Sequence, residues 1–176
     1  MALDEVAAGD FIFDDYMNYI VRRQVNRPVC RLTLTSNVTL NSTGSNIGIV
    51  FGSGTEVLDD RGWHSISTNT SRVTPDLAGR YLVQANATFA GAATTTVDRR
   101  VMVLKNSGLT ACWFRNSSPL TASQSMSVAI SDVIEMNGTT DFFQMAAFTQ
   151  VVQDLAGTGD SVGSTCFTVT FLGDSL

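Results

Sequence analysis

The sequence predicts an all-β protein, and three of its features support this prediction. Apolar and polar residues alternate in many short runs, Gly, Asn and Ser cluster between these runs, and helical spacing is confined to one N-terminal segment. No strand–helix–strand unit and no repeat of fixed period is visible. With 176 residues, the chain is long enough to bury the core of one sandwich or barrel domain.

The clearest predicted strand covers residues 79–89. Apolar side chains occupy alternate positions along it, so they share one face, and that face is expected to be buried: Tyr81, Val83, Ala85, Ala87 and Phe89. The run 165–172 alternates in the same way and directs three residues inward: Phe167, Val169 and Phe171. Further strands are expected at 30–35, 46–51, 97–105, 109–115, 124–136 and 141–152.

Residues 1–28 differ from the rest and are predicted to form an N-terminal arm before a β domain over 29–176. Asp14-Asp15 can cap a short helix over 16–24, because their side-chain oxygens accept hydrogen bonds from its first backbone N–H groups. The acidic start and the basic end, Arg22-Arg23, both match the helix dipole. One short helix cannot form a core, so the arm is expected to pack on the β domain or on another molecule.

The charge pattern limits the partners that the chain can have. The net charge is −5, which leaves no basic face for nucleic acid, and no apolar stretch is long enough to span a membrane. Charged residues make up 15% of the chain, well below the usual quarter. Such a low fraction fits a protein that covers part of its surface with other chains, and it fits equally an ordinary Thr-rich β protein.

The residues that carry out catalysis or bind metals are scarce, and the chain is predicted not to be an enzyme. The single histidine, His64, has Ser65 and Ser67 nearby, but neither lies in the Gly-x-Ser-x-Gly turn that presents a nucleophile. Three widely spaced cysteines favour buried thiols over disulfides or a zinc site. The loop aspartates lack the spacing of a calcium loop and are interpreted as solvated. No cofactor and no metal are expected.

Two short motifs precede the C-terminal strand in a recognisable order. Gly79-Arg-Tyr81 comes first, Leu104-Lys-Asn106 follows, and Cys166-Phe-Thr-Val-Thr-Phe-Leu-Gly ends the series. Over roughly residues 60–173 the chain resembles the globular heads of complement and tumour-necrosis-factor-like proteins. The Gly-Asp usual before the second-last strands has no clean match, and 134–138 stands in its place. The resemblance implies a jelly-roll β-sandwich that forms a tight trimer, with one sheet of each subunit facing the axis.

The expected fold is therefore an all-β jelly-roll β-sandwich with a short N-terminal arm containing one short helix. Within it, the run 142–148 is apolar on both faces, which is typical of a strand that is buried on both sides. Such a strand belongs to a plain sandwich core or to an interface, where aromatic residues and Met are enriched. The residues predicted for the trimer interface are Phe142, Phe143, Met145 and Phe148.

The functional hypothesis is a virion structural protein. Residues 8–20 look like short leader segments of tailed-phage structural proteins, and the start of the chain lacks the basic and apolar regions of a signal peptide. The chain is expected to be a homotrimeric decoration or cement protein that stabilises the phage head, made in the host cytoplasm and located on the capsid surface. Its partner would be the major capsid protein or another virion protein. The arm residues predicted as the capsid anchor are Phe11, Phe13, Tyr16, Tyr19, Ile20, Arg22 and Arg23.

Other functions remain open from the sequence. A receptor-binding tip of a tail fibre or head fibre would share the fold and bind a host glycan or protein through the loops 90–96, 116–124 and 153–164. An extracellular complement-like head would need a secretion route. The pair Arg99-Arg100, after Asp98, is expected either to contact a carboxylate of a partner or to lie on a solvated strand edge.

Overall fold

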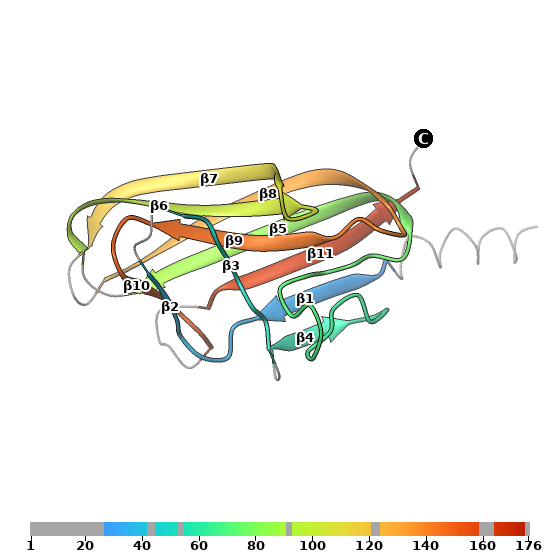
Figure 1. Ribbon diagram of the computed structural model, residues 1–176, viewed down its shortest axis with the longest axis horizontal. Coiled ribbons are helices and arrows are strands. Elements are labelled where there is room, and N and C mark those ends of the chain that lie inside the picture. The colour runs from blue at the N-terminus through green and yellow to red at the C-terminus, as the bar shows by residue number, and fades with distance from the viewer. Residues whose placement is uncertain are drawn as a thin grey trace, which may run out of the picture.

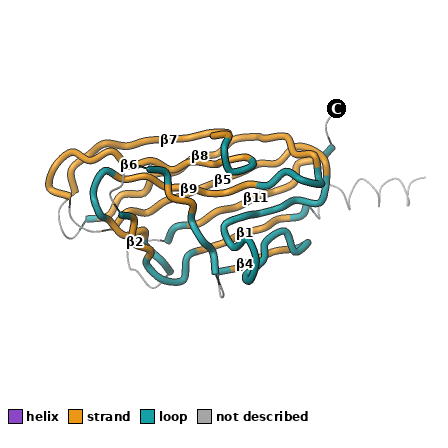
Figure 2. The backbone as a smooth tube through the Cα atoms, in the orientation of Figure 1, coloured by secondary structure: helices purple, strands orange, loops and turns teal. Residues whose placement is uncertain are grey.

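Two antiparallel sheets make up the described part of the chain. The computed structural model describes residues 27–41, 45–52, 55–90, 93–120, 124–158 and 164–174. Every regular element in these ranges is a strand (Figure 2), which confirms the all-β prediction. The predicted helix over 16–24 and the proposed capsid anchor lie outside the described residues.

The larger sheet is built around one long central strand, β5 (Ala78–Ala90). β8 (Ser125–Asn137) pairs with it along its whole length on one side. On its other side β5 pairs first with β11 (Cys166–Gly173) and then with β10 (Gln153–Leu155), so these two strands lie end to end. β1 (Val29–Thr33) continues the sheet beside β11, β2 (Val38–Leu40) beside β10, and β4 (Glu56–Asp59) forms the edge next to β1.

The smaller sheet has the order β3-β9-β6-β7. Its strands are β3 (Ile47–Gly48), β9 (Phe143–Thr149), β6 (Ala93–Lys105) and β7 (Leu109–Leu120), and every pairing between them is antiparallel. Figure 1 shows β4 at one side of the molecule and β7 with β8 at the opposite side. There β7 and β8 contact each other across the two sheets, although no hydrogen-bonded ladder joins these two described strands.

The core lies between the two sheets and matches the predicted alternation. The five inward residues of β5 from Tyr81 to Phe89 are each at most 2% exposed, and Phe167 and Val169 of β11 are buried beside them. The ring of Tyr81 packs edge-on against Trp63 and Phe143, with centroid distances of 5.6 and 6.0 Å. Its hydroxyl donates to the Leu77 carbonyl at 2.6 Å, so the one polar atom of this buried ring is satisfied.

The two sequence motifs hold backbone conformations that most other residues adopt only at a cost. Gly79 has φ +148°, and a Cβ there would lie 2.4 Å from the Gly173 carbonyl oxygen, so only glycine allows β11 to approach. Asn106 has φ 54°, a left-handed conformation that asparagine tolerates well. Its side chain donates to Asp141 at 2.8 Å and accepts from the Phe142 N–H at 3.0 Å, which ties the β6–β7 turn to the start of β9.

Arg99 differs from both expectations for it, because it is fully buried between the sheets. It follows the alternation of β6, which also directs Val101 and Val103 inward. Its Nε donates to Gln153 Oε1 at 2.7 Å and its Nη1 to the Ser118 carbonyl at 2.7 Å, whereas Nη2 has no partner among the described residues. This burial lowers the pKa of the guanidinium. Arg99 is therefore a core residue that ties β6 to β7 and β10.

Candidate functional site

The middle of the larger sheet's outer face carries almost no charge. Cross-strand pairing arranges its outward side chains in rows, one of which joins Leu58, Arg31, Thr168, Gln84 and Ser131. The neighbouring rows are Val29–Thr170–Leu82–Val133 and Thr33–Cys166–Asn86–Ala129. Apart from Arg31, these three rows are uncharged, and the next pair, Arg80 and Glu135, lies opposite each other at one end. We call the surface formed by these three rows the low-charge face.

The low-charge face is hollowed in its middle. A shallow cavity of about 630 Å³ extends across β1, β11, β5 and β8. Residues of these strands and of β4 line it, some of them through their backbone: Val29, Arg31, Leu58, Gln84, Ala85, Asn86, Ala129, Ile130, Ser131, Cys166 and Thr168. Many of them are small, so the sheet surface is accessible there. A sheet face open to water usually carries polar and charged side chains, and this one carries neutral, partly apolar ones.

The edge formed by β7 and β8 differs from the low-charge face, because it exposes an aromatic ring. Phe114 on β7 pairs with Val101, which places it on the inward side of the smaller sheet. It is nevertheless 51% exposed, since no described strand continues the sheet beyond β7. Asp132 on β8 is exposed at the same edge and forms no ion pair with a described residue. We call Phe114 and Asp132 the open edge.

The residues predicted for the trimer interface lie mostly inside the subunit. Phe143 and Met145 are fully buried in the sandwich core, so they have no exposed side-chain surface to offer a neighbour. Phe148 is nearly buried on the outer face of the smaller sheet, under the guanidinium of Arg100. Phe142 is partly exposed, and the Arg72 guanidinium lies 4.0 Å from its ring centroid. The subunit's own packing thus accounts for this apolar run.

The residues of the low-charge face and the open edge were not singled out from the sequence. Their outward side chains look individually like ordinary strand residues, and β4, which supplies Leu58, was not predicted. One signal was present: 29–33, 78–90 and 166–173 place Thr, Gln, Asn and Cys, with few charged residues, between their inward apolar side chains.

His64 is held by hydrogen bonds on both sides of its ring. Its side chain is fully buried, Nδ1 lies 2.7 Å from Glu56 Oε1, and Nε2 lies 3.2 Å from the Thr70 carbonyl oxygen. The neighbouring Ser65 hydroxyl lies 3.0 Å from Thr68 Oγ1. The described contacts of His64 therefore connect β4 to the loop at 65–72, and neither ring nitrogen faces a serine hydroxyl.

The three thiols are free, and all three are shielded from water to some degree. Burial raises the pKa of Cys112 to about 11 and also raises the pKa of Cys30 and Cys166, so the neutral thiol is favoured. The described residues contain no group of three His, Cys, Asp or Glu side chains placed to hold a metal ion. They also contain no helix of the length and apolar character needed to cross a membrane.

Comparison with known proteins identifies the fold. No family model matches the chain, and no curated protein matches it. Among solved structures, murine APRIL is similar with a TM-score of 0.59 and 16% identity, over 84% of this chain and 100% of that chain. The globular domain of zebrafish complement 1qA matches with a TM-score of 0.56 and 12% identity, over 84% and 99%. The Eiger TNF structure from S. frugiperda matches with a TM-score of 0.55 and 13% identity, over 85% and 95%.

These likenesses confirm the jelly-roll prediction and the resemblance to complement and tumour-necrosis-factor-like heads at the level of the fold. At identities of 12–16% they show the architecture of the described domain, and they do not extend to what the similar proteins bind.

Proposed function

We propose that the chain forms a homotrimer through its low-charge face, and that this trimer is a structural component of a virus particle. The observation that carries the proposal is the hollowed outer face of the larger sheet, which has one charge, on Arg31, across three rows of side chains. Interface cores are depleted in charged residues, and an exposed face with that composition suits contact with another chain.

The open edge supplies a complementary surface for this face. Phe114 projects from the edge, and the face offers a shallow cavity with Leu58 and Val29 among its lining residues. When one surface of a subunit fits a different surface of the next, the contact is head-to-tail and closes into a ring if the rotation allows it. A ring of three is what the resemblance to complement and tumour-necrosis-factor-like heads implies.

Charge supports the same pairing. Arg31 is the single charge on the low-charge face and forms no ion pair with a described residue of its own chain. Asp132 at the open edge likewise forms no ion pair with a described residue of its own chain. Bringing the edge of one subunit onto the face of the next would let these two opposite charges meet, which would fix the register of the contact.

The virion assignment rests on the arm and on the composition. We propose that the trimer decorates or cements the capsid, that it is made in the host cytoplasm, and that residues 1–28 anchor it to the major capsid protein or another virion protein. Three arms on one trimer bind multivalently, so a weak contact for each arm gives a firm attachment. The action is mechanical, and the proposal includes no catalysed reaction, cofactor, nucleic acid or membrane.

The trimer is tested by its mass in solution. Light scattering on a sizing column is expected to give three times 18.9 kDa for the full chain. Val133→Asp places a charge on the low-charge face and should give monomers, whereas Ile66→Asp, at an exposed residue outside the three rows, should leave the trimer intact. A monomeric parent protein, or an unchanged mass for the Val133 variant, would refute the proposed interface.

The charge pair offers a second test of the same contact. Arg31→Glu and Asp132→Arg should each weaken the trimer, because each places like charges opposite each other, and the double variant should restore it. If the double variant is no better than the single ones, the edge does not meet the face in this register.

The arm is tested on particles. Deleting residues 1–25 should abolish particle binding and leave the trimer mass unchanged apart from the lost residues. Full binding by the truncated protein would contradict the anchor. Labelled protein over the head would support decoration, and label at the tail would instead support the second candidate function, a receptor-binding fibre tip.

A further inference from the structure

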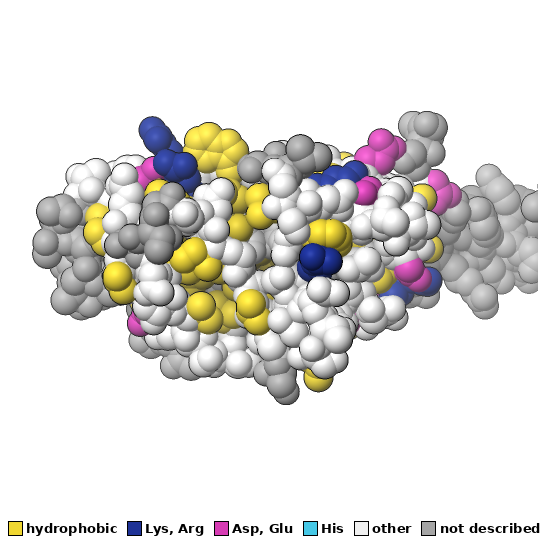
Figure 3. Space-filling model, viewed as in Figure 1, with side chains coloured by type: hydrophobic (Ala, Val, Ile, Leu, Met, Phe, Trp, Pro, Cys, Tyr) yellow, Lys and Arg dark blue, Asp and Glu magenta, His cyan; other side chains and the backbone are white. Residues whose placement is uncertain are grey.

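A second surface stands out on the outer face of the smaller sheet, where a tryptophan is exposed. Trp113 on β7 is 53% exposed and lies opposite Met102 on β6. Together with Asn46, Arg100 and Met102 it lines a shallow pocket of about 240 Å³. Arg115 is the cross-strand neighbour of Arg100 beside it. We call these five residues the Trp113 patch. Figure 3 shows hydrophobic surface next to Lys and Arg side chains at the upper left, over β6 and β7.

Buried apolar residues lie beneath and beside the patch. Met102 and Phe148 are nearly buried and Ala146 is fully buried, and they form a small cluster on the outer side of the sheet, separate from the main core. Pairing aligns Trp113, Met102, Ala146 and Gly48 in one row across the four strands. A Cβ at Gly48 would meet no atom within 4 Å, so this end of the row is open.

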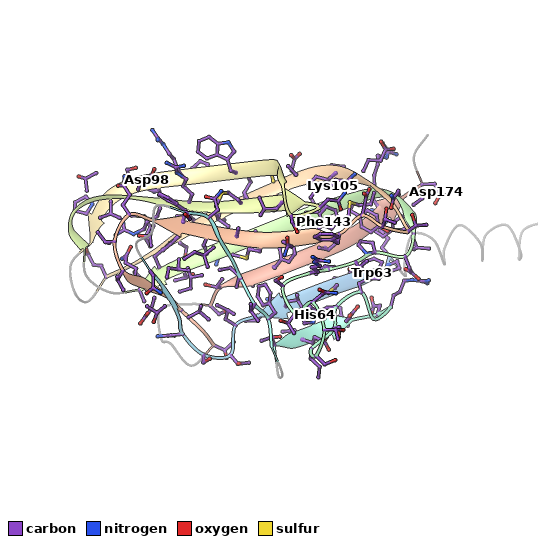
Figure 4. All side chains as sticks on the ribbon, in the orientation of Figure 1. Trp63, His64, Asp98, Lys105, Phe143 and Asp174 are labelled. Carbon is purple, nitrogen blue, oxygen red and sulfur yellow. The ribbon has the colours of Figure 1, made fainter. Side chains whose placement is uncertain are left out.

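Arg100 is held in a defined orientation. Asp98, labelled in Figure 4, lies two residues before Arg100 on β6 and accepts hydrogen bonds from Arg100 Nε at 2.9 Å and from Nη2 through the same oxygen. The guanidinium lies 4.5 Å from the ring centroid of Phe148 and 5.8 Å from that of Trp113. Contacts of this kind fix a planar cation between aromatic rings. Nη1 of Arg100 donates to none of the described residues and remains available to a ligand.

The charge of the patch is opposite to that of the whole protein. Arg100 and Arg115 contribute two positive charges and Asp98 one negative charge, which leaves one net positive charge on a chain of net charge −5. Arg115 is held only loosely, since its Nη1 lies 4.0 Å from Asp98 Oδ2 and its side chain is 59% exposed. An anionic group is therefore favoured at this place, and guanidinium groups bind a carboxylate well because their N–H groups match its two oxygens.

We propose that the Trp113 patch binds an acidic saccharide, with the sugar ring over the indole and its carboxylate at Arg100 and Arg115. A sugar ring has an apolar C–H face and a polar rim, which matches an exposed indole bordered by the Asn46 amide and two guanidinium groups. The pocket is smaller than the roughly 300–1,000 Å³ of sites for drug-sized ligands, so it suits one sugar unit. A protein partner would need about 1,000 Å² of complementary surface around it.

This inference deepens the receptor-binding alternative of the proposed function and needs neither the trimer nor the virion. The proposed subunit contact uses the outer face of the other sheet and the open edge. The Trp113 patch faces outward from the smaller sheet, so a sugar is expected to bind whether the subunits are assembled or not. Failure of one proposal therefore leaves the other intact.

The two tryptophans of the chain provide a direct test with an internal control. Trp63 is buried and its Nε1 donates to Asp76 at 2.7 Å, whereas Trp113 is exposed. In a heteronuclear NMR titration of the full-length protein with sodium glucuronate, the indole N–H signal of Trp113 should shift saturably and that of Trp63 should not move. Glucose should bind at least about fivefold more weakly, and acetate should produce no saturable shift of the Trp113 signal.

Three substitutions test the same binding site, and two results would overturn the proposal. Trp113→Ala should lower glucuronate affinity at least tenfold, followed through the backbone amide signals of β6, and Arg115→Ala should abolish the preference over glucose. Ile66→Ala removes an equally exposed apolar side chain elsewhere and should change nothing. Equal shifts with acetate would show an anion site only and overturn the proposal. Absence of any saturable shift with glucuronate would also overturn it, even if Trp113→Ala abolished attachment to a protein partner.

Discussion

Phe143 distinguishes a core role from an interface role more sharply than any other residue, because the two roles predict opposite results for one substitution. Its side chain is fully buried, its ring packs edge-on against Tyr81, and its backbone exchanges two hydrogen bonds with Val73, at 2.9 and 2.8 Å. Phe143→Ala keeps those backbone bonds and removes the ring. The result is a cavity next to the aromatic cluster that joins the two sheets.

The size of the effect follows from this burial. Removal of a fully buried Phe side chain costs about 3–5 kcal/mol, because the transfer free energy of the ring is lost and the cavity closes only partly. We expect a loss of about 4 kcal/mol from the free energy of unfolding, out of a total of about 5–15 kcal/mol for a domain. With a urea m-value of about 2.5 kcal/mol/M, the midpoint should fall by about 1.6 M.

Urea unfolding followed by circular dichroism at two protein concentrations measures this change and separates it from dissociation. Val133→Ala is the matched control, since Val133 is exposed on the low-charge face. It should leave subunit stability within about 0.5 kcal/mol, and the proposed trimer should dissociate at a higher protein concentration than that of the parent protein. If Phe143→Ala instead left the midpoint unchanged at low concentration and dissociated the proposed trimer, Phe143 would be an interface residue and its assignment to the subunit core would be wrong.

Three further predictions concern the fold and its titration. Gly79→Ala should lower the free energy of unfolding by more than about 2 kcal/mol in thermal or urea unfolding, because φ is +148° and the new Cβ would lie 2.4 Å from the Gly173 carbonyl oxygen, whereas Gly108→Ala should be tolerated. Hydrogen bonds from Arg61 and from the Trp63 indole hold the pKa of Asp76 at about 2, below its usual 3.8, so its stabilising contribution is full above about pH 4 and is lost as the pH falls toward 2. Asp76→Asn should therefore make the urea midpoint depend less on pH in that window. An unchanged dependence on pH would contradict the lowered pKa of Asp76. Because burial raises the pKa of Cys112 to about 11, a disulfide reagent near pH 8 should label it far more slowly in the native protein than in denaturant, and equal rates would show that the thiol is accessible.

The long strands could be read from the sequence because their alternation is regular. The predicted run 79–89 lies within β5, 97–105 within β6, and 165–172 overlaps β11, since each carries one apolar face against the core. β2, β4 and β10 were not predicted, because three or four residues are too few to show a period. β4 is also irregular, with a register shift against β1 between Arg31 and Leu32, which breaks the pattern further.

The apolar run at 142–148 shows where sequence reasoning lacked information. Its inward side chains, such as Phe143 and Met145, fill the core as a sandwich strand should. Its outward side chains are apolar too, and the structure shows that Met102 and Arg100 on the neighbouring strand cover Ala146 and Phe148. The sequence cannot show which strand lies beside β9, so it could not separate this local cover from a contact between subunits.

The sequence by itself determined the all-β class, the inward face of each long strand and the two motifs at Gly79 and Asn106, because alternation and backbone conformation depend on residues close together in the chain. Only the tertiary structure decided that Arg99 is buried, that five strands join their neutral side chains into one low-charge face, and that Trp113 lies beside two arginines. These features depend on the register between strands far apart in the sequence, and register is set by packing of the whole core.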